Sequence, residues 1–169
     1  MAVRFSRYHS SVFITITIRK TEVVKMDVQT KKEKLLKAIH AKELEDCFRI
    51  KETEEGEVLF QVFHEVKNGG FLMTIDINDK EYTPVVFHIA ELEDPAKEQE
   101  IHMLKLLNDF NNNSILLRYT LDQNGIYAEF SYLHSAEYFD AEDLIDWTIA
   151  GYQEIRDLRY SKIMQLVWS

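Results

Sequence analysis

Ile115-Leu-Leu-Arg-Tyr-Thr-Leu121, Asp122-Gln-Asn-Gly125 and Ile126-Tyr-Ala-Glu-Phe-Ser-Tyr-Leu133 follow one another in the stretch that decides the fold. Apolar residues alternate with polar ones on both sides of an Asn-Gly pair, which tolerates the positive φ angles of a tight hairpin turn. The pattern predicts a β-hairpin. One face of its two strands is expected to carry Ile115, Leu117, Tyr119 and Leu121, then Ile126, Ala128, Phe130 and Tyr132.

A long amphipathic helix is predicted after this hairpin. Asp140 is placed as its N-cap, and Glu142 and Asp143 lie near the positive end of the helix dipole. The apolar stripe of this helix is expected to consist of Leu144, Thr148, Tyr152, Ile155, Leu158, Ile163 and Leu166.

The part of the chain before the hairpin is predicted to form a helix, a run of strands and a second helix. Thr30-Lys-Lys-Glu33 fits a capping box, and the helix that it opens is expected to end near Asp46. Three or four strands follow between Phe48 and Ile89, and another helix runs from Asp94-Pro95 to Asn113. The sequence therefore predicts an α+β fold with an antiparallel sheet, in the order helix, strands, helix, hairpin, helix, close to α-β-β-β-α-β-β-α.

Residues 1–25 form a basic N-terminal extension to a predicted single domain over 26–169. Within the extension, Ser11-Val-Phe-Ile-Thr-Ile-Thr-Ile18 has the β-branched composition of a strand, so an additional strand is one interpretation. The other interpretation is that the natural protein begins at Met26.

The C-terminal part resembles the YbjN-like family in Leu116–Leu133, followed by Asp140-Ala-Glu-Asp-Leu-Ile-Asp-Trp147. The whole order of elements, α-β-β-β-α-β-β-α, resembles the fold shared by class I type III secretion chaperones and the YbjN-like family, and over about 27–112 this resemblance is one of topology alone. This resemblance implies a chaperone-like protein without enzymatic activity, which often dimerises and acts through protein contacts. It transfers no catalytic residue.

Net charge restricts the partners that are expected. The chain of 169 residues has a formal net charge of −9, and residues 41–169 hold eleven Lys/Arg against twenty-six Asp/Glu. An acidic body repels phosphate backbones, so no direct nucleic-acid binding is expected. A single cysteine and no apolar run of membrane-spanning length predict a cytoplasmic protein without a membrane partner.

No catalytic, cofactor-binding or metal-binding residue is predicted. His40-Ala-Lys-Glu43 lacks the second histidine of a zinc-binding helix, and Asp76–Glu81 lacks the glycine of a calcium loop. Cys47 has no nearby group that would activate it, and no nucleophile-elbow or phosphate-binding glycine motif is present.

Two contact surfaces are predicted instead. Aromatic and apolar residues of the hairpin and last helix are candidates for a dimer or partner interface, since tyrosine and tryptophan are frequent at binding hot spots. These residues are Tyr127, Leu133, Tyr138 and Trp147. The candidate acidic contact surface consists of Glu91, Glu93, Glu137, Asp140, Glu142 and Asp143.

Two functions follow from these surfaces. The first is a non-enzymatic protein, expected as a homodimer, that binds a partner protein with a basic surface. The alternative is an acidic inhibitor of the phage type, which mimics nucleic acid and blocks a nucleic-acid-binding defence enzyme. For the acidic residues, a solvated surface that keeps the protein soluble is the default interpretation.

Overall fold

The structure, a computed structural model, describes residues 26–67, 69–92, 95–122 and 125–168. The additional strand predicted within residues 1–25 lies outside the described residues. In the part of the chain that is described, no helix is long and apolar enough to cross a membrane.

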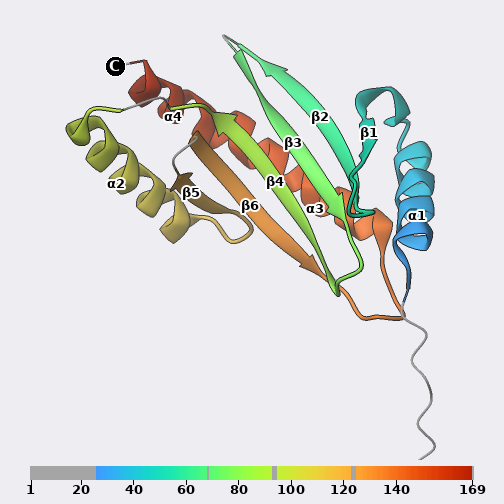
Figure 1. Cartoon of the computed structure of the whole chain (residues 1–169). Coiled ribbons are helices and arrows are strands. Elements are labelled where there is room, and N and C mark those ends of the chain that lie inside the picture. The colour runs from blue at the N-terminus through green and yellow to red at the C-terminus, as the bar shows by residue number, and fades with distance from the viewer. Residues whose placement is uncertain (1–25, 68, 93–94, 123–124, 169) are drawn as a thin grey trace, which may run out of the picture.

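Helices and strands follow the predicted order, with four strands between the first two helices (Figure 1). In chain order they are α1 (Val28–Ala41), the short 3-10 helix η1 (Glu45–Cys47), β1 (Arg49–Glu52), β2 (Val58–Val66), β3 (Gly69–Ile77), β4 (Tyr82–Ala90), α2 (Lys97–Asn113), β5 (Arg118–Asp122), β6 (Gly125–Leu133), α3 (Ala141–Glu154), the π-helical turn η2 (Ile155–Arg159) and α4 (Tyr160–Val167). The α+β prediction is confirmed.

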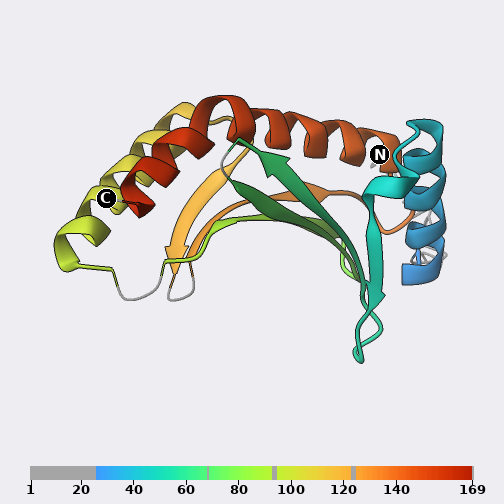
Figure 2. The same ribbon diagram turned by 90° about the horizontal axis from the view of Figure 1, so that it is seen from above.

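The six strands form one antiparallel sheet in the order β1-β2-β3-β4-β6-β5. Figure 2 shows the arched sheet with α3 to α4 running along one face and no described helix over the other. Helix α1 lies beside α3 at the β1 end, and α2 packs on β5 at the opposite end. The sheet therefore has one helix-covered face and one open face.

The hydrophobic core lies between the sheet and the helices that cover it. Every second residue of the central strands is buried there, because alternate side chains of a strand point to opposite faces. The strand residues of this core include Phe60, Val62, Phe71, Met73, Ile75, Val85, Phe87, Ile126, Ala128 and Phe130. The helices contribute Leu35, Ile39, Leu107, Phe110, Leu144, Ile145, Ile155 and Ile163.

Helix α1 begins earlier than the capping box predicted. Asp27, not Thr30, is its N-cap, and the Asp27 carboxylate accepts a hydrogen bond from the Thr30 backbone N–H at 2.7 Å. Lys31 is buried, and its ammonium group donates to the carbonyl oxygens of Asn78 and Lys80 at 2.9 and 2.5 Å. These bonds tie the first helix to the turn between β3 and β4.

The C-terminal helix contains one irregular turn. Residues Ile155–Arg159 are π-helical. The next buried residue after Ile155 is therefore Tyr160, and this spacing is wider than the usual three or four residues. Leu158, which the regular stripe placed in the core, is 58% exposed as a result. That prediction was wrong, whereas the prediction of Asp140 as N-cap is confirmed by its bonds from the N–H groups of Glu142 and Asp143.

The first strand of the hairpin is shorter than predicted. β5 begins at Arg118, so Ile115 lies outside the sheet and is fully exposed. The outer edge of β5 is covered by α2: the Asn111 side-chain amide donates to the Tyr119 carbonyl at 2.9 Å and accepts from the Tyr119 N–H at 2.7 Å. One side chain thereby satisfies the edge groups that a further strand would otherwise use.

Candidate binding surface

An apolar row crosses the open face of the sheet. The register places Phe63 of β2 opposite Leu72 of β3, Leu72 opposite His88 of β4, and His88 opposite Tyr127 of β6. We call these four residues the open-face row. Their sequence neighbours are buried on the helix side, so the row faces away from the helices.

Two ring contacts shape this row. The Phe63 side chain is 62% exposed, and its ring lies over Gly70, where an added Cβ would come within 2.5 Å of Phe63 Cζ. The His88 and Tyr127 rings stack with centroids 4.7 Å apart and planes at 15°. The result is a semi-exposed aromatic surface without a covering element among the described residues, which is typical of interaction sites.

Carboxylates lie beside one end of the row. The pKa of the Tyr127 hydroxyl is raised, first by burial and then by the nearby carboxylates of Asp122 and Glu91. A predicted interface residue, Tyr127, and a predicted acidic contact, Glu91, therefore belong to the same neighbourhood.

The other predicted interface residues are dispersed. Leu133 is exposed on the same face of β6, six residues beyond Tyr127. Tyr138 lies in the connection to α3 and donates to an Asp140 carboxylate oxygen at 2.9 Å. Trp147 is on α3, where its indole N–H donates to Asp143 at 3.0 Å. The four residues do not form one patch.

The predicted acidic surface is divided in the same way. Glu91 follows β4 at the Gly125 end of β6, whereas Glu137, Asp140, Glu142 and Asp143 follow the Leu133 end. Glu93 lies outside the described residues. Asp140 caps α3, and Asp143 accepts from the Tyr132 hydroxyl at 2.9 Å. Two of the acids thus act within the fold as hydrogen-bond acceptors.

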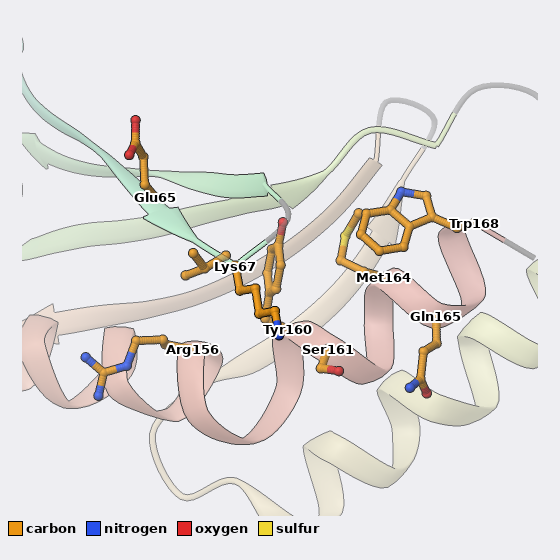
Figure 3. A pocket seen from close by; sticks show the side chains of 9 residues that line it. Glu65, Lys67, Arg156, Tyr160, Ser161, Met164, Gln165 and Trp168 are labelled. Atoms are coloured by element: carbon orange, nitrogen blue, oxygen red, sulfur yellow. The ribbon is translucent and has the colours of Figure 1, made fainter.

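A broad groove lies between the end of β2 and the C-terminal helix (Figure 3). It has a volume of about 580 Å³ and contains Tyr160, Met164 and Trp168 as its apolar wall. Glu65, Arg156 and Gln165 point in different directions in this view, so no set of polar groups converges on a ligand. Arg156 is held in a bidentate pair with Asp157 at 2.6 and 2.7 Å.

No cluster of three or more metal-ligating side chains occurs within the described residues. Cys47 is a free, exposed thiol. His64 and His88 each have a buried Nε2 atom that no described residue hydrogen-bonds, and burial lowers the pKa of the His64 imidazole.

Asp76 is an acidic residue of the open face whose carboxyl group is partly buried. It lies opposite Leu59, and its Oδ1 atom is buried without a hydrogen-bond partner in the described part of the chain. Burial raises the pKa of its carboxyl group. The folded state therefore binds this proton more tightly than the unfolded state does. Its contribution to stability is lost as pH rises from about 4 through the folded pKa.

We expect Asp76→Asn to raise the free energy of unfolding by roughly 0.5–1.5 kcal/mol at pH 7.5, because it removes a buried charge. Urea denaturation at pH 7.5 and at pH 3.5 measures this effect. The gain should shrink at the lower pH, where the wild-type carboxyl group is protonated. Glu54→Gln, in the exposed turn after β1, is the control. An equal gain at both pH values would contradict the assignment.

Sequence reasoning missed Phe63 and Leu72 as surface residues, and it did not group His88 with Tyr127. Strand alternation identifies which residues share a face, but the transverse row depends on the register between four strands.

No protein-family model matches this chain, and no curated protein matches it.

Proposed function

We propose that this protein acts without catalysis, by binding another protein through the open face of its sheet. The observation that carries the proposal is the open-face row of Phe63, Leu72, His88 and Tyr127, which the described helices leave uncovered. An antiparallel sheet tolerates water on one face, but that face then usually alternates to polar residues. Here one transverse row, Phe63, Leu72, His88 and Tyr127, is apolar and aromatic beside a polar row that includes Gln61 and Thr74. An apolar centre within a polar rim is the usual composition of protein interfaces.

The partner we propose carries apolar anchor residues within a basic surface. Residues 26–169 hold 15 Lys/Arg against 28 Asp/Glu, so a basic partner is attracted and a second copy of this region is repelled. The resemblance to type III secretion chaperones and to the YbjN-like family agrees with a protein-binding role, and membership of either family remains part of this proposal.

Phe63→Ser tests the proposal, with Leu158→Ser as the matched control. Phe63 and Leu158 are similarly exposed, but Leu158 lies on the helix side of the molecule. A partner captured from the source cells is identified, purified and titrated by calorimetry against each variant. We expect Phe63→Ser to weaken binding about 30-fold or more, the effect of losing a hot-spot side chain, and Leu158→Ser to leave it unchanged.

Two other outcomes would contradict the proposal. Binding that is unaffected by Phe63→Ser but abolished by 0.5 M salt would favour the alternative of an acidic nucleic-acid mimic. A concentration-dependent dimer in sedimentation velocity that Tyr127→Ala dissociates would show that the open face is occupied by a second copy.

A further inference from the structure

A separate apolar pocket lies on the helix-covered side of the sheet. Its volume is about 250 Å³, and its floor is formed by Met73 of β3 together with Ile145 and Thr148 of α3. Val62 and His64 of β2 complete the inner wall. These residues point away from the open face, so the pocket and the open-face row lie on opposite sides of the sheet.

The lip of the pocket is the short connection between α1 and β1. Leu44, Cys47 and Phe48 line the opening, and η1 within this connection is held by a hydrogen bond from the Cys47 N–H to the Leu44 carbonyl at 3.0 Å. The Phe48 ring packs edge-on against Phe60, with centroids 6.2 Å apart. Cys47 is exposed, so the pocket can be reached from solvent beside its sulfur atom.

The polar atoms around the pocket are already engaged or uncharged. The Thr148 hydroxyl donates to the Leu144 carbonyl at 2.7 Å. The His64 imidazole is stacked on Tyr152 with centroids 4.1 Å apart, and burial lowers its pKa so that it is neutral at pH 7. Hence, among the described residues, no lysine, arginine or charged histidine lines the pocket to bind an anion.

Protein interiors are close-packed, so an unfilled apolar recess between a sheet and the helix that covers it is uncommon. An apolar cavity of about 150 Å³ is enough to bind benzene. By the same scale, a pocket of about 250 Å³ accommodates a bicyclic hydrocarbon or a short acyl chain.

We propose that the pocket between η1, β2 and α3 is a binding site for a small neutral apolar molecule of about ten carbon atoms. Apolar walls supply the affinity, and the described part of the chain offers no lining cation to compensate the charge of a carboxylate or phosphate of the same size, so such anions bind more weakly. The site is distinct from the open-face row, and its occupancy does not depend on the proposed partner.

The test uses the full chain and the probe 1-fluoronaphthalene, observed by 19F NMR. We expect saturable binding with one probe per chain. Cys47 is the only cysteine in the sequence, so a benzyl thiosulfonate reagent attaches a benzyl group at the lip through a disulfide bond. This label should weaken probe binding roughly tenfold or more, and dithiothreitol, which removes the label, should restore it.

The controls separate this pocket from other apolar surfaces. Cys47→Ser should bind the probe like wild type before and after treatment with the reagent, and Phe63→Ser should bind it normally. The anion 4-fluorobenzoate should bind at least about tenfold more weakly than 4-fluorotoluene, a neutral molecule of the same size. The proposal is overturned if the unlabelled protein shows no saturable binding, if the label leaves binding unchanged, or if the anion binds as well as 4-fluorotoluene.

Discussion

Glu154→Ala is expected to lower the free energy of unfolding by about 3–5 kcal/mol, because it leaves a largely buried cation and two hydroxyl groups without their acceptor. Glu154 Oε1 accepts from the Tyr119 hydroxyl at 3.0 Å and from Arg159 Nε at 3.2 Å, and Oε2 accepts from the Ser114 hydroxyl at 3.0 Å. The side chains of Arg159 and Glu154 are only 11% and 17% exposed.

This cluster joins four separate parts of the chain. Ser114 ends α2, Tyr119 is in β5, Glu154 ends α3, and Arg159 closes the π turn with its guanidinium 4.7 Å from the centre of the Phe110 ring. Burial raises the pKa of the Tyr119 hydroxyl, and the neighbouring Glu154 carboxylate raises it further, so Tyr119 remains a donor. Losing Glu154 therefore affects the docking of α2 and β5 as well as the C-terminal helix.

Urea denaturation measures the effect, with two comparison variants. Asp157→Ala removes the exposed partner of Arg156 in the same turn and should lower the free energy of unfolding far less, because surface ion pairs contribute little. Glu154→Gln keeps two hydrogen-bonding atoms without the charge. Its loss in the free energy of unfolding should lie between those of Glu154→Ala and Asp157→Ala. If Glu154→Ala is no more harmful than Asp157→Ala, the cluster does not stabilise the fold as described.

Gly125→Ala is the second change with a large expected effect. Gly125 opens β6 with φ +151°, in the region that favours glycine, and an added Cβ would lie 2.2 Å from the carbonyl oxygen of Ala90. The obstacle is backbone, so no side-chain rotation relieves it. We expect a loss on the order of 3 kcal/mol from the φ strain and the clash together.

Gly56→Ala provides the control for this glycine. Gly56 also has a positive φ, +84°, but no atom lies within 4 Å of the position that its Cβ would take. Its replacement should cost only the conformational penalty, about 1–2 kcal/mol. Thermal and urea unfolding of both variants separates the two contributions, and equal losses would show that the approach of Ala90 is unimportant.

Local patterns were sufficient to predict much of the fold. The hairpin before and after Asn-Gly and the cap at Asp140 depend on residues that are close together in the sequence, and both are confirmed. Ile115 was placed wrongly because alternation continues beyond the point where β5 ends. Leu158 was placed wrongly because a regular period of 3.6 residues cannot anticipate a π turn.

The candidate surface was less predictable, because it depends on contacts between distant residues. Tyr127 was identified from its aromatic character. The other three residues of the open-face row, Phe63, Leu72 and His88, come from other strands. The acids of α3 were interpreted as surface charges, whereas Asp143 receives hydrogen bonds from Tyr132 and Trp147. A tally of acidic residues does not distinguish an acceptor within the fold from a solvated carboxylate.

The π turn also affects how this chain should be compared with others. It adds one residue to the helix, while Ile155 at its start and Tyr160 directly after it both remain buried. A relative with a regular helix would therefore require a one-residue gap between Glu154 and Tyr160 in a sequence alignment. Without that gap, Tyr160 and Ile163 would be matched to exposed positions, and the similarity of the two helices would be underestimated from that point to the C-terminus.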